Sequence, residues 1–569
     1  MYQRNVAFAV EFTLAVAAIA MLQGCSDMSP SLDDGDRSES FRGKGKGKGK
    51  GKGKGKKKGK GKHDDDCDEL TLIGLEPIGV YETGVFDASA AEITAFDPAS
   101  ARLFVVNGDA KAVDVLDLSD PATPTLLDSL DLGAYGDSPT SVDVADGLVA
   151  VAVAAAPAQA PGRVVLVAAA DLAYVNDLQV GALPDMLTFT PDRTKLVVAC
   201  EGEPEDDYII DPEGAVAIID VSADVASLTD GDVQIADFSG FNPNNLDPQV
   251  RVFGLGSSVA QDMEPEFVAV SADSSTAWVT LQENNALAIV DLDSATITEI
   301  VPLGYKDHSI AGNGFDASDE DGQINIANWP VFGMYQPDGI HSFRVGGQEY
   351  LITANEGDAR GYDALDEEVR VEHLVLDLDQ FPSAMSLQQD EQLGRLTVSA
   401  VMGDVGGGGD HEQLYAFGSR SISIWSADGS LVWDSGDQLE QITAEVDPAH
   451  FNGANDSNEA FESRSDAKGP EPEGVVTGAL WGKTYAFIGL ERIGGIMVYD
   501  VSDPLSPSFV LYDNSTRDFA GDPELGTAGD LGPEGLELVT AADSPSGEPL
   551  LIVANEVSGT VRVYQLLAE

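Results

Sequence analysis

Short apolar runs and polar turns alternate along most of the chain, from about residue 69 to the C-terminus. β-Branched and aromatic residues fill the runs, Gly, Pro, Asn and Asp separate them, and no long helical period appears. The pattern is clearest between residues 264 and 304, where four strand-like runs follow one another. Repeated units of four antiparallel strands are typical of propeller blades. The sequence therefore predicts an all-β fold, a single large β-propeller over residues 69–569.

The same four-strand unit recurs at eight places, although a count of seven blades is the alternative. The candidates lie near residues 90–133, 138–181, 184–238, 264–304, 337–376, 395–436, 472–513 and 533–566, and the one near 395 is the least regular. The run Ile73 to Tyr81 has no hairpin of its own. We expect it to supply the outer strand of the last blade, which closes the ring and leaves no exposed sheet edge. Long insertions are expected at about 239–263, 305–336 and 437–471.

The first 25 residues have the features of an export signal. A weakly basic start precedes the apolar run Val6 to Leu22, which ends at Leu22-Gln23-Gly24-Cys25. This ending resembles a bacterial lipoprotein box, in which the thiol of Cys25 is lipidated and anchors the protein in the cell membrane. We expect a membrane-anchored lipoprotein that faces the periplasm or the cell exterior. The alternatives are a plain secretory signal, which gives a secreted protein, and an uncleaved anchor.

Residues 26–68 are predicted to be a disordered tether. Gly43 to Lys62 is almost pure Gly-Lys alternation, which offers no apolar face and repels itself. An acidic stretch that includes Cys67 follows it. After Cys25, the remaining cysteines are Cys67 and Cys200, and the sequence leaves open whether they form a disulfide.

The chain is strongly acidic, with 97 Asp and Glu against 32 Lys and Arg and a formal net charge of −65. From Thr71 onward there are 86 acidic residues against 18 basic ones. Such a chain repels phosphate, so nucleic acid is excluded as a partner. The charge favours a saline habitat or the binding of divalent cations, and cationic partners are a third explanation.

Acidic residues recur at two fixed places in the predicted blade. One set follows a proline where the inner strand begins, and the other set stands where the next strand ends. The first set is Asp185, Glu266, Asp338, Glu473 and Glu534, and the second is Glu201, Glu283, Glu356, Glu491 and Glu556. Antiparallel pairing places the start of one strand beside the end of the next, so both sets should ring one mouth of the central channel.

Ten carboxylates around one opening must be neutralised by cations, by arginine or by raised pKa values. Oxygen ligands of this kind suit Ca²⁺, with Mg²⁺ as the second choice. The competing interpretation is that each acid merely caps a turn through backbone N–H groups. For the mouth as a whole we predict at least one bound cation.

The acidic segment from Asp316 to Ile324 resembles a calcium loop at first sight. When Gly322 is aligned with the glycine of an EF-hand, Ala317 falls at the first ligand position and Asn328 at the last. This fails the EF-hand pattern. A calcium loop of another kind and a solvated acidic turn remain as the two interpretations.

Several longer motifs resemble the choice-of-anchor I domain family of bacterial surface or secreted β-propellers, which are related to an echinoderm mesenchyme-specific cell-surface glycoprotein. They are Asn355-Glu356-Gly357-Asp358-Ala359-Arg360, residues 464–474 (RSDAKGPEPEG), Gly489-Leu490-Glu491-Arg492, Asp321-Gly322-Gln323-Ile324-Asn325-Ile326 and Ala554-Asn555-Glu556-Val557-Ser558-Gly559. The resemblance runs from about Glu69 to the C-terminus. It implies a propeller and an extracellular place, but no settled activity, since only some members are labelled alkaline phosphatase.

Two functional hypotheses follow. The first is a monomeric binding module that holds a divalent cation and an unknown surface ligand, polysaccharide or protein at its channel mouth. The second is a metal-dependent phosphoesterase, similar to alkaline phosphatases or to phytase-like propellers, in which calcium polarises a phosphoryl group and Arg360 and Arg464 bind the anion. The sequence contains no Gly-x-Ser-x-Gly, Walker or His-Glu-x-x-His motif and no evident nucleophile–base pair, so binding is preferred.

Overall fold

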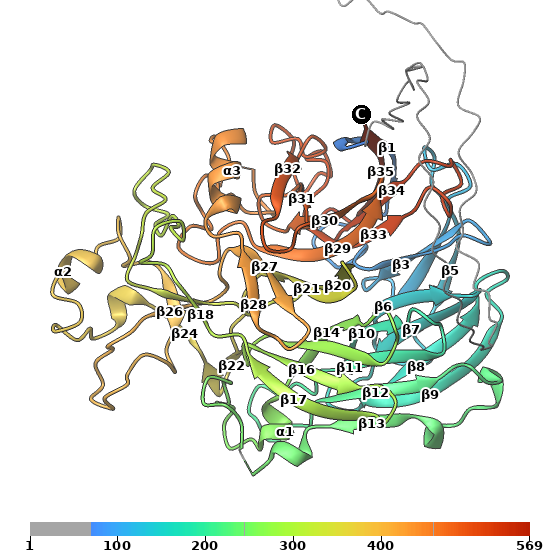
Figure 1. Cartoon of the computed structure of the whole chain (residues 1–569), viewed down its shortest axis with the longest axis horizontal. Coiled ribbons are helices and arrows are strands. Elements are labelled where there is room, and N and C mark those ends of the chain that lie inside the picture. Colours follow the sequence, from blue (N-terminus) through green and yellow to red (C-terminus); the bar gives the residue numbers. More distant parts are fainter. Residues whose placement is uncertain (1–69, 244, 459) are drawn as a thin grey trace, which may run out of the picture. The chain divides into compact units, whose positions relative to one another are not determined.

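A computed structural model describes residues 70–569 except 244 and 459, and the unit that contains the propeller begins at Asp68. The predicted export signal, Cys25, the Gly-Lys tether and Cys67 lie outside the described residues. Within residues 70–569, the described strands form seven four-stranded antiparallel sheets, which are the blades of a propeller (Figure 1). Within the described residues, no helix is both long enough and apolar enough to cross a membrane.

The blades follow one another along the chain. Blade 1 contains β2 (Thr94–Asp97), β3 (Arg102–Asn107), β4 (Ala112–Asp117) and β5 (Thr125–Asp131). Blade 2 contains β6 (Ser138–Ala145), β7 (Leu148–Ala154), β8 (Pro161–Ala168) and β9 (Tyr174–Ala182). Blade 3 contains β10 (Pro184–Phe189), β11 (Lys195–Cys200), β12 (Ala215–Asp220) and β13 (Gln234–Asp237). Blade 4 contains β14 (Pro265–Val270), β15 (Thr276–Leu281), β16 (Ala286–Asp291) and β17 (Thr296–Pro302).

The last three blades complete the ring. Blade 5 contains β20 (Ile340–Val345), β21 (Gln348–Asn355), β27 (Ser421–Ser426) and β28 (Leu431–Asp434). Blade 6 contains β29 (Pro472–Leu480), β30 (Lys483–Leu490), β31 (Ile496–Asp500) and β32 (Ser508–Asp513). Blade 7 contains β33 (Pro533–Val539), β34 (Leu550–Asn555), β35 (Thr560–Ala568) and β1 (Leu72–Glu82). The pairing of β1 with β35 confirms that the first strand supplies the outer strand of the last blade.

The count of eight blades was wrong, and the alternative of seven is correct for the described chain. The candidate near 395–436 is not a blade. Its last two strands belong to the sheet of β20 and β21, because β27 pairs with β21 and β28 pairs with β27. Residues 356–420 are therefore an insertion in the middle of blade 5, between its second and third strands. A repeat search that expects four consecutive strands counts the two halves of such a blade separately.

The second strand of a blade is the most buried, and the outer strand is more exposed. The second strand of blade 2, β7, is an unbroken apolar run that is buried at nearly every position, whereas the outer strand of blade 1, β5, is exposed at most of its positions. Tight turns connect the strands. Asp146 and Gly147 both have positive φ, at 49° and 77°, between β6 and β7. This is the geometry of the two-residue hairpin turn that the Asp-Gly sequence favours.

The hydrophobic core lies between neighbouring blades and closes the ring. Separate buried clusters join each blade to the next, including one that joins blade 7 to blade 1. The inner strands also follow one another in a closed circuit: β2 contacts β6 and β33, and the contacts continue through β10, β14, β20 and β29. Each inner strand therefore places its first residues at the same end of the central channel.

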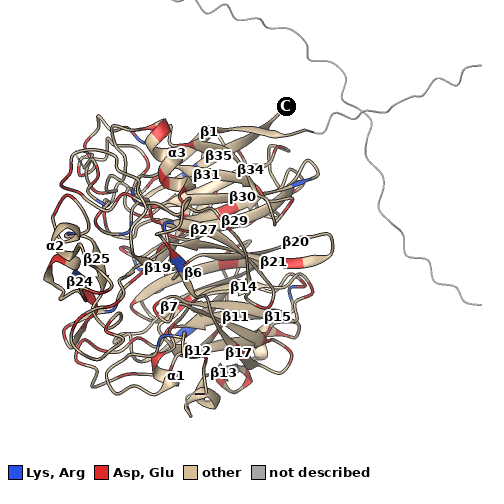
Figure 2. Cartoon of the chain, turned by 60° about the vertical axis from the view of Figure 1, so that its left-hand side comes forward, with Lys and Arg blue, Asp and Glu red and all other residues tan. Residues whose placement is uncertain are grey.

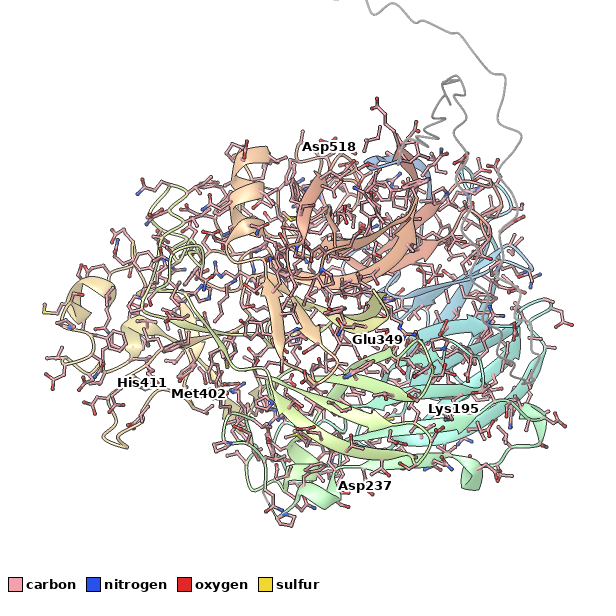
Figure 3. The ribbon with its side chains drawn as sticks, in the orientation of Figure 1. Lys195, Asp237, Glu349, Met402, His411 and Asp518 are labelled. Atoms are coloured by element: carbon pink, nitrogen blue, oxygen red, sulfur yellow. The ribbon has the colours of Figure 1, made fainter. Side chains whose placement is uncertain are left out.

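The insertions form a lobe beside the ring. Three short strands, β18 (Tyr305–Asp307), β19 (Phe332–Met334) and β26 (Tyr415–Ala416), form one sheet. The pairs β22 (Gly361–Tyr362) with β23 (Leu365–Asp366) and β24 (Glu368–Arg370) with β25 (Thr397–Ser399) form two more. The helices are α1 (Val259–Asp262), α2 (Ala384–Leu387) and α3 (Gln438–Val446), and the 3-10 turns are η1 (Val225–Ser227), η2 (Asp230–Asp232), η3 (Ser239–Phe241) and η4 (Val371–His373). One buried cluster, which includes Phe315 and Trp329, joins the 305–336 and 371–417 parts of the lobe. Figure 3 shows Met402 and His411 in this lobe, on the left of the view.

Candidate functional site: an acidic channel mouth

The sequence motif of a proline followed by an acid marks the start of inner strands. β10, β14, β29 and β33 each begin at such a proline. The register then pairs that proline with the end of the second strand: Pro184 with Cys200, Pro265 with Leu281, Pro472 with Leu490, and Pro533 with Asn555. The acids after the prolines and the acids that follow the second strands consequently lie at one end of each blade.

Glycine after the acid lets neighbouring blades approach closely. A Cβ atom on Gly474 would lie 1.9 Å from the carbonyl oxygen of Glu534, and one on Gly339 would lie 2.3 Å from that of Glu473. A Cβ on Gly535 would lie 2.2 Å from the carbonyl oxygen of Glu92. Side chains cannot fit at these positions, so the Pro-acid-Gly sequences draw consecutive acids together around the channel.

A cavity of about 390 Å³ lies in the channel at this end and extends along the inner strands. Nine carboxylates line it, with His341, and no lysine or arginine does. Seven of the ten predicted acids are among them: Asp185, Glu201, Glu266, Asp338, Glu356, Glu473 and Glu534. The other two, Asp143 and Glu537, stand further along the inner strands. Figure 2 shows acidic residues over many loops of the molecule and only a few basic ones.

Six of the predicted acids in this cavity have no partner within the described chain. Asp185, Glu201, Glu266, Asp338, Glu473 and Glu534 take part in none of the hydrogen bonds or ion pairs made by the described side chains. One oxygen of Glu266, of Glu473 and of Glu534 is fully buried and unpartnered. These acids therefore do not cap turns, which was the competing interpretation for each of them.

Burial, followed by mutual repulsion, raises the pKa values of these carboxyl groups. Desolvation is the largest cause for Glu266, Asp338, Glu473 and Glu534, whose pKa values are held well above the ordinary range, and neighbouring acids of the ring add to it. Burial, followed by the charge of Glu203, raises the pKa of Asp185 to about 7. Without a cation, the ring holds protons at a pH where free carboxyl groups have lost them.

The other three predicted acids do not line the cavity, and two of them have side-chain partners. Glu491 accepts a hydrogen bond from Asn455 Nδ2 at 2.9 Å and lies 3.1 Å from Arg492 Nη1. Glu556 accepts a hydrogen bond from the Ser89 hydroxyl at 2.8 Å. Glu283 is almost completely buried, and one of its oxygens has no partner.

Two groups of three acids bring their oxygens within 4.8 Å of one another: Asp338 with Glu356 and Glu473, and Glu356 with Glu471 and Glu491. The second group is already neutralised by three cations. Lys468, Arg464 and Arg492 all contact the fully buried Glu471, at 3.3, 2.7 and 3.0 Å. Burial alone would raise the pKa of Glu471, but these cations lower it to about 2.

The first group retains unpaired charge. Glu356 lies 2.7 Å from Lys468 Nζ and accepts a hydrogen bond from Gln282, whereas Asp338 and Glu473 have neither kind of partner. Three carboxylates that share one lysine are a suitable ligand set for a hard divalent cation. The predicted role of all ten acids as metal ligands stays a prediction, and this group is where the geometry best fits it.

Both arginines of the phosphoesterase hypothesis are engaged with carboxylates. Arg360 is 2% exposed and contacts Asp262 at 2.6 Å and Glu264 at 2.9 Å. Arg464 donates two hydrogen bonds to Glu471, at 2.9 and 2.7 Å. Neither guanidinium is directed at the acidic cavity, so no contact in the described chain favours phosphate binding there.

Sequence reasoning missed some members of the ring. Glu92 occupies the position of the Pro-acid residues in blade 1, since its carbonyl accepts the amide of Gly535 at 3.1 Å and its carboxylate acts on Glu534. Ile93 follows it where blades 5, 6 and 7 have glycine, and no proline precedes it, so no motif marked it. Blade 2 has Thr140 there, and the Thr140 hydroxyl donates a hydrogen bond to the carbonyl of Pro184 at 2.6 Å. The acid ring is therefore interrupted at blade 2.

Whether Cys67 and Cys200 form a disulfide, which the sequence left open, stays open. Cys200 is a free thiol with no exposed surface, at the end of β11, and Cys67 lies outside the described residues. Burial raises the pKa of the Cys200 thiol to about 12.

The fold and the channel mouth together define the class of protein: a seven-bladed β-propeller whose channel opens through a ring of carboxylates. Residues 92–504 match the choice-of-anchor I domain, so the chain belongs to that family and is a cell-surface β-propeller. This confirms the resemblance inferred from the motifs.

The chain is also similar to named relatives and to solved structures. The chain is 29% identical over 191 residues to Gigasin-3a of Magallana gigas, covering 32% of this chain and 67% of the relative. It is 29% identical over 290 residues to the mesenchyme-specific cell surface glycoprotein of Strongylocentrotus purpuratus, covering 45% of this chain but only 36% of that protein.

Among solved structures, Kuenenia stuttgartiensis hydrazine synthase aligns over 85% of this chain and 99% of its own, with 13% identity and a TM-score of 0.44. The β-propeller domain of Myceliophteria thermophila Cps50 (Swd1) aligns over 87% of this chain and 100% of its own, with 8% identity and a TM-score of 0.40.

Proposed function

We propose that this cell-surface propeller binds a divalent cation at its acidic channel mouth and uses the bound ion to hold a surface ligand. The observation that carries the proposal is the set of six unpartnered carboxylates around a cavity that no lysine or arginine lines. Buried charges of one sign are stable only when a counter-charge or a proton accompanies them. A cation supplies that counter-charge at the pH of most natural waters.

Asp338, Glu356 and Glu473 are the ligands we assign to the ion. Their oxygens lie within 4.8 Å of one another, and Lys468 is the only cation that contacts any of them in the described chain. We expect Ca²⁺ in preference to Mg²⁺. Ca²⁺ accepts six to eight oxygen ligands in flexible geometry, whereas Mg²⁺ demands a near-ideal octahedron. Asp338 and Glu356 adjoin two strands of blade 5, and Glu473 belongs to blade 6, so the three acids are held by two rigid sheets and their spacing cannot adjust to the short distances that Mg²⁺ requires.

An ion held this way keeps ligand positions that face the channel. Three carboxylates do not complete the coordination shell of Ca²⁺, and water or an oxygen-bearing ligand fills the rest. We propose a polysaccharide or a protein of the cell surroundings as the ligand, held through its own oxygen atoms. A direct contact between the acid ring and an anionic ligand would be repulsive, so binding of such a ligand should depend on the ion.

A lipid on Cys25 is the proposed attachment to the membrane, facing the periplasm or the exterior. Cells that express the chain are grown with radioactive palmitate, and the label on the protein is compared with that on Cys25→Ser. We expect label only on the unchanged chain. Equal label on both proteins would show that Cys25 is not the lipidated residue.

The cation site is tested by calcium titration of the purified full-length protein after chelation. We expect Ca²⁺ to bind and to raise the melting temperature, since a ligand at 100 times its Kd stabilises the folded state by about 2.7 kcal/mol. Glu473→Gln should abolish most of this binding, and Glu299→Gln, which changes an exposed acid on β17, should not. Calcium affinity that is unchanged in Glu473→Gln and Asp338→Asn would refute the site.

A further inference from the structure

The start of the acidic loop 316–325 is packed into the lobe, whereas Glu320, Gly322 and Gln323 at its tip are exposed. Backbone hydrogen bonds in both directions between Phe315 and Ala327, at 3.0 and 3.1 Å, close the loop at its base. Asp316 has no exposed surface, and its carboxylate accepts the amide of Asn325 across the loop at 3.0 Å. The amide of Asp316 in turn donates to Glu440 of α3 at 2.8 Å. The loop is thus fixed between the propeller and segment 437–471.

Two carboxylates meet at the tip of this loop, and each has one oxygen without a partner. Asp321 accepts the amide of Gln323 through Oδ1 at 2.9 Å, and Glu462 accepts the amide of Gly322 through Oε1 at 2.8 Å. The second oxygens, Oδ2 of Asp321 and Oε2 of Glu462, are buried and accept no hydrogen bond. Glu462 is only 3% exposed, so its charge is more than nine-tenths removed from water.

The basic residues near the loop are occupied by other acids. Arg395 pairs with Asp319, and Arg420 pairs with Glu440 at 2.7 Å. Within the described chain, neither Asp321 nor Glu462 forms an ion pair. Asp321 is only partly buried, but its Oδ2 and the Glu462 Oε2 are both shielded from water, and two such oxygens without a counter-charge are unstable as a pair of anions.

We propose that this loop holds a second divalent cation, of the calcium class, between Asp321 Oδ2 and Glu462 Oε2. The site is separate from the channel mouth, where both groups of three converging acids lie. It therefore takes two carboxylates from the protein and completes its shell with backbone carbonyl oxygens and water, as calcium sites commonly do. Asp316 adds negative charge nearby, since it interacts with Asp321.

Binding of the ion has a consequence for the channel mouth. The bound ion ties the loop to the segment that carries Arg464 and Lys468. Those residues contact Glu471 and Glu356 at the channel mouth, so this ion would stabilise the support of the first site.

The test separates the two sites by substituting one ligand of each. Asp321→Asn, Glu462→Gln and Glu473→Gln variants of the full-length protein are chelated and titrated with CaCl₂, and both the number of ions bound per chain and the melting temperature are measured. Glu320→Gln is the matched control, because Glu320 is an exposed acid of the same loop. We expect Asp321→Asn and Glu462→Gln each to lose one ion per chain, while Glu473→Gln loses a different one and Glu320→Gln loses none.

Melting temperatures provide a readout that a purely structural role would not produce. Glu462→Gln removes the repulsion with Asp321, and its amide can donate to Asp321, so the variant should melt as high as the unchanged protein or higher in chelator. In excess calcium, Glu462→Gln should melt at a lower temperature than the unchanged protein. Calcium stoichiometry and calcium-induced shift that are unchanged in both loop variants would overturn the proposal. If all calcium binding disappears in Glu473→Gln alone, the loop site is absent although the mouth site stands.

Discussion

The glycine that follows the acid in blade 6 gives the sharpest test of how the mouth is built. Gly474→Ala adds a Cβ atom 1.9 Å from the carbonyl oxygen of Glu534, whereas ordinary contact begins at 3.4 Å. The two inner strands must therefore separate by about 1.5 Å at this point. The obstacle is backbone of the next blade, which cannot turn away as a flexible side chain would.

The cost of this change can be bounded. Overpacking a well-filled interior costs about 1–3 kcal/mol, and a backbone obstacle places this case near the upper end. Replacing glycine also lowers the conformational entropy of the unfolded chain, which stabilises the folded protein by about 0.4–1 kcal/mol. We expect a net loss of about 2 kcal/mol. The entropy of unfolding is about 2.1 cal/mol/K per residue, so for about 500 folded residues this loss lowers Tm by about 2 °C.

The assay is thermal unfolding, followed by circular dichroism, together with calcium titration. Gly361→Ala is the control, because a Cβ atom there has nothing within 4 Å. It should melt like the unchanged protein. Gly474→Ala should also bind calcium more weakly, since the separation moves Glu473 away from its neighbours. A Gly474→Ala variant with unchanged Tm and unchanged calcium affinity would refute the view that close blade contact assembles the ring.

Two further predictions concern charge. Burial and the nearby Asp143 raise the pKa of Glu537 from 4.5 to about 8. Between these two values the folded protein keeps the proton of Glu537, whereas the unfolded chain loses it. The free energy of unfolding therefore falls as the pH rises from about 4.5 to 8. At 1.36 kcal/mol per pKa unit, urea unfolding should show Glu537→Gln to be more stable than the unchanged protein by up to about 5 kcal/mol at pH 9. At pH 4 the two proteins should be equally stable. Equal stability at both pH values would contradict this prediction. Glu471→Gln leaves three cations around a neutral group and should destabilise the protein by about 3–5 kcal/mol at pH 7, whereas Glu299→Gln should change little; a loss under 1 kcal/mol would show that the cations do not depend on Glu471.

The blade pattern and the position of the acids followed from local sequence, because both depend on neighbouring strands. A proline before an acid marks the start of an inner strand, and antiparallel pairing then determines which residues share an end of the blade. The blade count depended on a longer-range fact. Residues 356–420 leave blade 5 after its second strand and return to it as β27, and nothing in the local pattern of β27 and β28 indicates which strands they pair with.

The neutralisation of the acids was also beyond local reasoning. Glu356 meets Lys468, which is 112 residues away, and Arg360 meets Asp262, which is 98 residues away. Such pairs are made by loops whose course the strand pattern does not specify. The sequence therefore indicated that cations or arginines must balance the ring, but not which acids would remain unpaired.

The difference between the neutralised acids and the unpaired acids is the strongest physical argument that the channel mouth is functional. The chain has few basic residues, with 18 Lys and Arg from Thr71 onward, and three of them surround the single acid Glu471. If the ring acids only needed neutralising for stability, basic side chains would be expected among them, since a buried unpaired carboxylate is costly. Instead the cavity wall contains none, and the basic residues hold the loops behind it. An arrangement that is unfavourable for the empty protein becomes favourable when a cation enters, which is how a binding site, as opposed to a structural ion-pair network, is expected to be built.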